Sequence, residues 1–225
     1  MKKIILFVLA VNFIVGLAMV SCESTNNEQT TNTEKVASPK VDETRKAAIA
    51  DSIAKAKQKN DSIAKQKNDS IINVAKGKVV VKSDEFSDRV WVEPKSAPKY
   101  RNRNGIYCYF AMENNKPTDN FRFVFQYYAE DWLFIRSIIF NIDGENITIY
   151  PNMETDCGGG YIWEWFDENY SYDLELIQKI ANAKSVKMKL NGRQYYDTRT
   201  LTSTQINDIK LIYEYYKALG GKFKK

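Results

Sequence analysis

Apolar and polar residues alternate in short runs through the second half of the chain, which is the pattern of half-buried β-strands. The clearest run is 121–128, in which every second residue is aromatic. The run 131–141 is apolar on nearly both sides, which predicts a longer strand at the centre of a sheet. Asp143-Gly144 and Asn191-Gly192 are signals for two-residue hairpin turns. Further strands are predicted at 89–93, 105–112, 145–150, 161–166, 185–190 and 193–197.

Two stretches have the apolar spacing of helices. One is 173–183, and the other begins after Thr202, which with Gln205 forms a capping box, and ends at Gly220. The predicted domain, 84–225, is therefore of the α+β class. We expect a mostly antiparallel, curved sheet of six to eight strands with two helices on one face, preceded by a long N-terminal helical spacer.

The first 22 residues have the order of features found in a secretory signal. Two lysines precede the apolar run 4–20, and Ser21 and Cys22 follow it. This order resembles the signal and lipobox of bacterial lipoproteins, in which the cysteine becomes the lipidated first residue. The resemblance implies a signal peptide at 1–21, palmitate on Cys22 and a lipid-anchored place in the cell envelope, with the outer membrane favoured. The alternative is an uncleaved membrane helix, since about 17 apolar residues can just span a bilayer.

The composition changes twice between Cys22 and the domain. Residues 22–42 are mostly small, polar or acidic, which predicts a disordered linker. Residues 43–78 are rich in Ala, Lys and Gln, which predicts a basic helical spacer. Its Asp-Ser-Ile-Ala-Lys segment at 51–55 recurs at 61–65. This repeat resembles the spacers of many uncharacterised lipoproteins of the Bacteroidetes, and carries no activity with it. Residues 43–76 serve either as a solvated spacer or for self-association as a coiled coil.

The charge of the chain is unevenly distributed. The formal net charge is +5, and residues 43–78 alone hold nine basic and four acidic residues, whereas 84–225 hold 19 and 20. The domain therefore lacks the clustered positive charge of a nucleic-acid-binding protein. The sequence contains no histidine, which excludes Ser-His-Asp and Cys-His catalysis and histidine-ligated zinc. We expect no catalytic residue, metal or cofactor.

Two cysteines remain besides Cys22. A disulfide between Cys108 and Cys157 would close a loop of about 50 residues and stabilise the fold by roughly 4 kcal/mol, in a compartment that permits such bonds. Two buried free thiols are the alternative.

The segment 157–172 has the highest density of aromatic and acidic residues. On a strand, Tyr161, Trp163 and Trp165 share one face. If that face meets solvent, it is a platform for stacking on a sugar ring or gripping a protein partner, joined by Tyr170 and Tyr172. If it faces the helices, the same rings belong to the core.

Two charged residues occupy apolar strand faces. Glu164 lies between Ile162 and Phe166 on its own face, and Arg136 lies within the apolar run 131–141. A buried carboxylate requires a cationic or hydrogen-bonding partner. We therefore expect Arg136 and Glu164 to form a buried ion pair of structural importance.

These patterns predict a non-catalytic recognition domain that a lipid anchor presents to an envelope protein or a glycan. The alternative is a small envelope hydrolase that cleaves glycans with paired carboxylates. No spacing distinguishes its candidate acids from ordinary loop acids, and the candidates are Glu154, Asp156, Glu164, Asp167 and Glu168.

Overall fold

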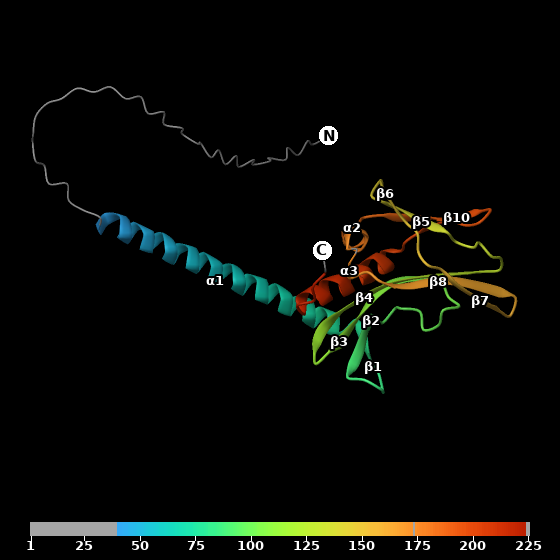
Figure 1. Ribbon diagram of the computed structural model, residues 1–225, viewed down its shortest axis with the longest axis horizontal. Helices are drawn as coiled ribbons and strands as arrows, with labels where there is room; N and C mark the ends of the chain where they lie inside the picture. Colours follow the sequence, from blue (N-terminus) through green and yellow to red (C-terminus); the bar gives the residue numbers. More distant parts are fainter. Residues whose placement is uncertain (1–39, 173, 224–225) are drawn as a thin grey trace, which may run out of the picture. The chain divides into compact units, whose positions relative to one another are not determined.

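The computed structural model describes residues 40–172 and 174–223, and within them the chain forms ten strands and three helices (Figure 1). In chain order the elements are α1 (Lys40–Lys76), β1 (Val79–Ser83), β2 (Arg89–Pro94), β3 (Gly105–Glu113), β4 (Lys116–Ala129), β5 (Ser137–Ile142), β6 (Glu145–Ile149), β7 (Glu154–Gly158), β8 (Tyr161–Asn169), α2 (Glu175–Asn182), β9 (Val186–Asn191), β10 (Tyr196–Thr200) and α3 (Ser203–Ala218). The chain divides into two compact units, 1–49 and 50–225, and all strands lie in the second.

The strands form two antiparallel sheets. The larger has six strands in the order β1-β2-β3-β4-β8-β7, and the smaller has four in the order β10-β9-β5-β6. The α+β class and the antiparallel pairing are thus confirmed. The expectation of one curved sheet was wrong, because the strands form two sheets. The Asp143-Gly144 hairpin pairs with the hairpin of β9 and β10 and does not extend the larger sheet.

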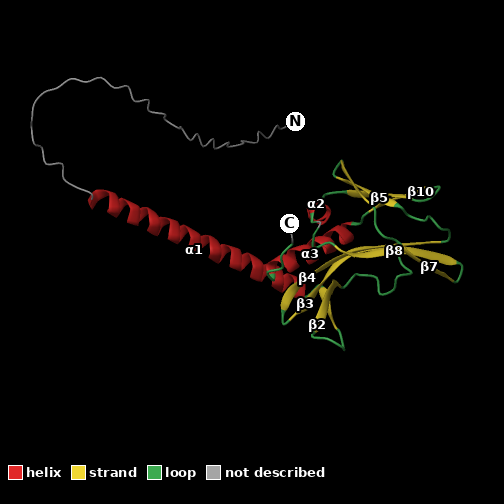
Figure 2. Ribbon diagram, in the orientation of Figure 1, coloured by secondary structure: helices red, strands yellow, loops and turns green. Residues whose placement is uncertain are grey.

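The core lies on one face of the six-stranded sheet, which we call the inner face. Helices α2 and α3 and the four-stranded sheet all lie on this side of it (Figure 2). The predicted aromatic row of β4 supplies the contacts: the ring centroids of Phe121 and Tyr216 of α3 lie 5.2 Å apart, and those of Phe123 and Phe140 of β5 lie 6.2 Å apart. One continuous apolar core therefore joins both sheets and both helices.

Helix α3 begins and packs as its sequence predicts. The Thr202 hydroxyl accepts a hydrogen bond from the Gln205 backbone N–H, and the Gln205 side chain accepts one from the Thr202 N–H. This capping box satisfies N–H groups that have no partner within the helix. The buried face that follows consists of Ile206, Ile209, Ile212, Tyr213, Tyr215 and Tyr216.

The predicted long strand at 131–141 was wrong in its first half. Residues 131–136 are irregular, and β5 begins only at Ser137. Phe134 has a φ of 53°, in the left-handed region. This turn directs consecutive backbone N–H groups to one side, as in an anion-binding nest. A periodicity argument cannot detect it, because the side chains at 132–135 are all large and apolar, as in a buried strand.

Several smaller elements differ from the expectation. Strands β1 and β7 extend the large sheet at its two ends, where no strand was predicted. Gly159 and Gly160, expected in a loop, are the turn of the β7–β8 hairpin, with φ values of 62° and 83°. The second hairpin turns over four residues, 192–195, and not over the predicted Asn-Gly pair.

Helix α1 spans Lys40–Lys76, and its C-terminal residues Ile72 and Ala75 contact the core of the second unit. Among the described helices none is both long and apolar enough to cross a membrane. The predicted signal peptide at 1–21, the lipidation site at Cys22 and the linker residues up to 39 lie outside the described residues.

Candidate binding face

The face of the six-stranded sheet opposite the core, which we call the outer face, presents the aromatic row of β8. Ile162, Glu164 and Phe166 point inward and are buried. Alternation therefore directs Tyr161, Trp163 and Trp165 outward, where Tyr161 is 41% exposed and both tryptophans are half-buried. The structure places these three predicted residues on one open face of the sheet.

The other two residues of the predicted surface do not extend this row. Tyr170 is only 7% exposed, and its ring meets Phe123 of the core at 5.1 Å in an edge-on arrangement. Its assignment to a binding surface was wrong, because β8 ends at Asn169 and the chain then turns toward the core. Tyr172 is 62% exposed but lies beyond the strand.

Neighbouring strands frame the aromatic row. Tyr128 of β4 stands beside Trp163, and its ring stacks on Tyr161 with centroids 5.1 Å apart. On the other side, Asp156 of β7 lies directly opposite Trp163. The Trp163 ring leans over Gly158, where an added Cβ would lie 3.4 Å from it. The indole ring thus lies against the backbone of β7.

A second aromatic cluster lies on β2 and β3 of the same face. Trp91 and Tyr109 have ring centroids 5.3 Å apart, and Tyr107 lies 6.2 Å from Tyr109. Burial, and then the charge of Asp167, raise the pKa of Tyr107 to about 12 and raise that of Tyr109 further. Both phenols are therefore neutral hydrogen-bonding groups at physiological pH.

Asp167 of β8 connects the two aromatic clusters. Its carboxylate accepts hydrogen bonds from Arg122 Nε at 2.6 Å and from the Tyr109 hydroxyl at 2.8 Å, and Arg122 also donates to the Asp167 carbonyl. Partial burial lowers the pKa of Arg122, but the hydrogen bond and charge of Asp167 outweigh it and raise that pKa. The charges in the middle of the face are thus internally paired.

The connection between β2 and β3, residues 95–104, is called the basic loop (Figure 2), and its middle part, residues 100–103, lies beside Trp163 of the outer face. The Arg101 guanidinium carbon lies 5.2 Å from the Trp165 ring centroid, a cation–π contact. Pro98 packs on Gly105, where an added Cβ would lie 2.6 Å from Pro98 Cγ. A hollow of about 450 Å³ lies between this loop and Trp163.

Polar atoms without partners gather in the same place. Asn102 Oδ1, Gln126 Oε1 and Trp165 Nε1 are buried and have no hydrogen-bond partner in the described part of the chain. Gln126 is 2% exposed and stands beside Trp165 in the strand register. Such groups are rare in native proteins and each calls for an explanation. Three of the four found in the described residues belong to the outer face or its loop.

The expected ion pair between Arg136 and Glu164 does not form. Glu164 is fully buried, and its carboxylate accepts hydrogen bonds from the backbone N–H groups of Leu133, Phe134 and Ile135 at 2.7–2.8 Å. The Arg136 side chain is exposed. The nest at 133–135 thus satisfies the carboxylate without a cation.

The disulfide also does not form, and both thiols are free. Cys108 is buried on β3 and Cys157 is exposed on β7, with β4 and β8 between them. At about 4.8 Å per strand, three strand spacings alone separate the two residues by roughly 14 Å, which is already beyond the reach of a disulfide. Burial raises the pKa of the Cys108 thiol well above its ordinary value.

The candidate acids for hydrolysis mostly have structural partners. Glu164 is bound to the nest and Asp167 to Arg122 and Tyr109, while Glu168 accepts the Asn152 backbone N–H at 2.8 Å. Asp156 accepts the N–H of Cys157. Of the described residues that line the hollow beside Trp163, none is an aspartate or a glutamate, whereas glycoside hydrolysis uses a pair of them.

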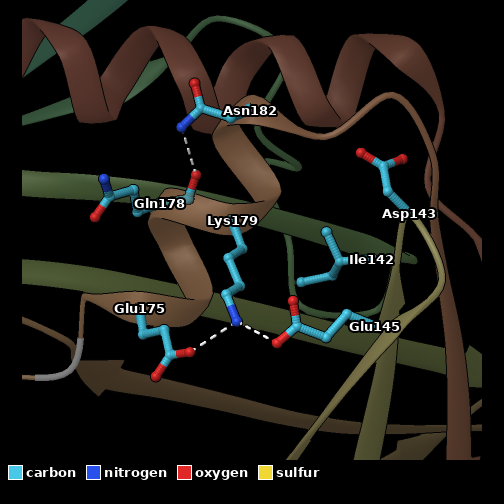
Figure 3. A pocket seen from close by; sticks show the side chains of 7 residues that line it. All are labelled: Ile142, Asp143, Glu145, Glu175, Gln178, Lys179 and Asn182. Carbon is cyan, nitrogen blue, oxygen red and sulfur yellow. Dashed lines mark hydrogen bonds and ion pairs between the residues drawn. The ribbon is translucent and has the colours of Figure 1, made fainter. Parts of the chain in front are cut away.

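A second hollow, of about 490 Å³, lies between α2 and the β5–β6 hairpin (Figure 3). Lys179 donates to Glu145 at 2.5 Å and to Glu175 at 2.8 Å, and the first of these bonds contributes most to raising the Lys179 pKa. Asp143 accepts the backbone N–H groups of Lys184 and Ser185. These charges are paired with one another, and their arrangement fastens α2 to the hairpin.

The sequence predicts a loop with two lysines and two arginines at 94–104, but sequence reasoning gave it no binding role and did not identify its hollow. The signal was present, because 95–104 contains four basic residues and no acid inside a domain of nearly balanced charge. In the described residues no three acidic or cysteine side chains gather as a metal site would require. Comparisons with protein-family models, with curated proteins and with solved structures give no match. The chemistry of the outer face is therefore the basis for assigning a function.

Proposed function

We propose that this chain is a lipid-anchored protein of the bacterial cell envelope, and that its α+β domain binds a glycan on the outer face without cleaving it. The observation that carries the proposal is the aromatic row Tyr161, Trp163 and Trp165, which lies beside the hollow of the basic loop. The outer membrane is the favoured location.

The chemistry of the face favours a sugar over a protein partner. Protein-binding sites have a contiguous apolar centre, with charged residues at the rim. Here the rings alternate with Arg101, Arg122 and Asp167, and amide groups lie among them. Planar rings beside hydrogen-bonding groups match a sugar, which has apolar C–H faces and a polar edge of hydroxyls.

The rest of the chain suits presentation of such a domain. A lipidated Cys22 would hold the protein at a membrane, because each buried CH₂ of an acyl chain contributes about 0.8 kcal/mol. The polar residues that follow, and helix α1, would then separate the binding face from the lipid surface.

Glycan binding is tested by calorimetric titration of the full-length protein with xylan, mannan, β-glucan, chitin oligomers, hyaluronan, alginate and polygalacturonate. We expect at least one to bind and Trp163→Ala to weaken that binding about tenfold, as loss of a stacked ring predicts. Trp132→Ala is the matched control, since that ring packs against the core side. Failure of every glycan to bind, or equal losses in the two variants, would refute glycan recognition by this face.

Anchoring is tested separately by metabolic labelling with an alkyne analogue of palmitate. We expect the wild-type protein and Cys157→Ser to be labelled and to sediment with membranes. Cys22→Ser should lose the label. Cys157 is a suitable control because its thiol is free and exposed. Persistent labelling of Cys22→Ser would rule out lipidation at that residue.

A further inference from the structure

We infer that the glycan is acidic, and that the hollow beside Trp163 holds one carboxylate-bearing sugar residue of it. The inference rests on the proposed glycan binding and specifies its chemistry. The hollow is lined by Tyr100, Arg101, Asn102, Arg103 and Trp163, so that two guanidinium groups and two rings surround one space. Its volume of about 450 Å³ lies within the range of small-ligand sites.

The guanidinium groups of this hollow have unused hydrogen-bonding capacity. Arg103 donates to the Asn102 carbonyl at 2.8 Å, and no carboxylate of the described chain lies within 4 Å of it. Arg101 reaches Asp167 Oδ2 only at 3.5 Å, while Arg122 holds the other oxygen of the same carboxylate at 2.6 Å. Because each guanidinium has five donors in a planar fork, both can bind a carboxylate with two parallel bonds.

The local charge favours an anion in spite of the balanced charge of the domain. The part of the basic loop that lines the hollow, residues 100–103, contains Arg101 and Arg103 and no acidic residue. On the far side of Trp163 stand Glu154 and Asp156 of β7. A bound acidic sugar would therefore turn its carboxylate toward the basic loop and its hydroxyls toward β7, where carboxylates accept hydrogen bonds.

The unpartnered polar atoms agree with a hydroxyl-rich ligand. Asn102 lines the hollow, and its Oδ1 has no donor in the described residues. Trp165 Nε1 lies beneath Arg101 and has no acceptor among the residues that the structure describes. A sugar hydroxyl both donates and accepts, so a small shift of the basic loop on binding would let one ligand satisfy groups of both kinds.

The experiment compares matched pairs of polysaccharides. Full-length protein is titrated with polygalacturonate, hyaluronan and alginate, and with the same polymers after chemical reduction of their carboxyl groups to alcohols. The sugar backbone is retained while the charge is removed. We expect at least one acid form to bind at least tenfold more tightly than its reduced form, with an affinity that falls as salt is added.

Variants then assign the effect to the hollow. Arg103→Gln should lower the affinity for the bound acid form about tenfold and leave that for the reduced form unchanged. Lys95→Gln is the matched control, because Lys95 donates to the Gly77 carbonyl and does not line the hollow. Since the Arg103 side chain is exposed, its replacement should not disturb folding, which circular dichroism checks.

The outcomes separate this inference from the proposed function. If the reduced forms bind as tightly as the acid forms, the acidic specificity is overturned and glycan recognition still stands. The same holds if a neutral glycan binds and the acid forms do not. If no polysaccharide of either kind binds, both are overturned. If Arg103→Gln and Lys95→Gln lower the affinity equally, the acid forms are attracted by the overall positive charge of the loop and not by the hollow. That result would also overturn the proposed site.

Discussion

The two faces of the six-stranded sheet are built by alternate residues of the same strands, yet they differ in how completely their polar groups are satisfied. On the inner face of β8 the buried charge, Glu164, receives three backbone hydrogen bonds within an apolar core. On the outer face Gln126 and Trp165 bury polar atoms that have no partner in the described chain. The buried carboxylate of the inner face thus has its hydrogen-bond partners within the protein, whereas two buried polar groups of the outer face have none in the described residues.

This difference indicates that the polar groups of the outer face serve a purpose other than stabilising the fold. A buried polar group without a partner costs about 1–3 kcal/mol, which folding alone does not explain. Aromatic rings on the inner face pack edge to face, as Phe121 and Tyr216 do. The rings of the outer face instead stand beside a hollow and a loop of basic residues. Changes that act on one face alone should therefore separate stability from binding.

The largest effect on stability is expected from Glu164→Gln. The amide would donate where the carboxylate accepts, so at least one N–H of the nest would lose its partner, and the free energy of unfolding should fall by about 3 kcal/mol. Urea unfolding of the full-length protein measures it. Glu168→Gln, on the same strand with one backbone bond, should cost under about 1 kcal/mol. Equal effects of the two substitutions would show that the nest is not a special support.

Gly105→Ala should act on the basic loop. An added Cβ would lie 2.6 Å from Pro98 Cγ and 2.9 Å from Gln126 Oε1, so the loop must move away from the sheet. We expect a loss of about 2 kcal/mol, typical of overpacking, and weaker glycan binding. Gly77→Ala has only an ordinary contact at 3.8 Å and serves as the control. If a stable Gly105→Ala protein binds the glycan as the wild type does, the position of the basic loop does not matter for binding.

The pH dependence of stability should reveal the burial of Tyr107. Its folded pKa of about 12 exceeds the ordinary value of 10.0, so the folded state retains a proton that the unfolded state releases between these values. The stabilising effect is fully present below pH 10 and is lost as pH rises toward 12, by about 1 kcal/mol at pH 11. Relative to Tyr107→Phe, the wild type should lose stability more steeply in this window. Parallel curves would exclude the predicted shift.

The smallest effect on stability is expected from Gln126→Met. Methionine has a similar length and removes an acceptor that has no partner, so unfolding should be unchanged or made harder by up to about 1 kcal/mol. If the amide contributes to binding, the same variant should bind the glycan less tightly. A destabilisation of about 2 kcal/mol or more is on the order of a lost hydrogen bond to a buried group. It would show that the Gln126 amide has a hydrogen-bond partner in solution, and that the two faces do not differ in how their polar groups are satisfied.

Local rules predicted those parts of the fold that depend on neighbouring residues. The capping box of α3, the turn at Asp143-Gly144 and the alternation along β8 each follow from a few adjacent side chains. The same alternation placed Trp163 and Trp165 on one face, but it could not say which face meets solvent. That choice depends on where the helices and the second sheet pack.

The remaining features depend on residues far apart in the sequence. The loop at 131–136 is held by a carboxylate about thirty positions away, so its apolar composition suggested a strand. Tyr170 is buried because the chain turns back to Phe121 after β8. The basic loop becomes part of a site only because Arg101 lies over Trp165. Each is a tertiary contact that neither spacing nor composition encodes.

The most direct measurement of the central claim follows the indole N–H signals of the four tryptophans by nuclear magnetic resonance while the bound glycan is titrated into the full-length protein. Single Trp→Phe variants assign the signals. If the outer face is the binding site, Trp163 and Trp165 should shift with a common saturation curve and Trp132, on the core side, should stay in place. A titration that shifts Trp132 and leaves Trp163 and Trp165 unmoved would contradict it.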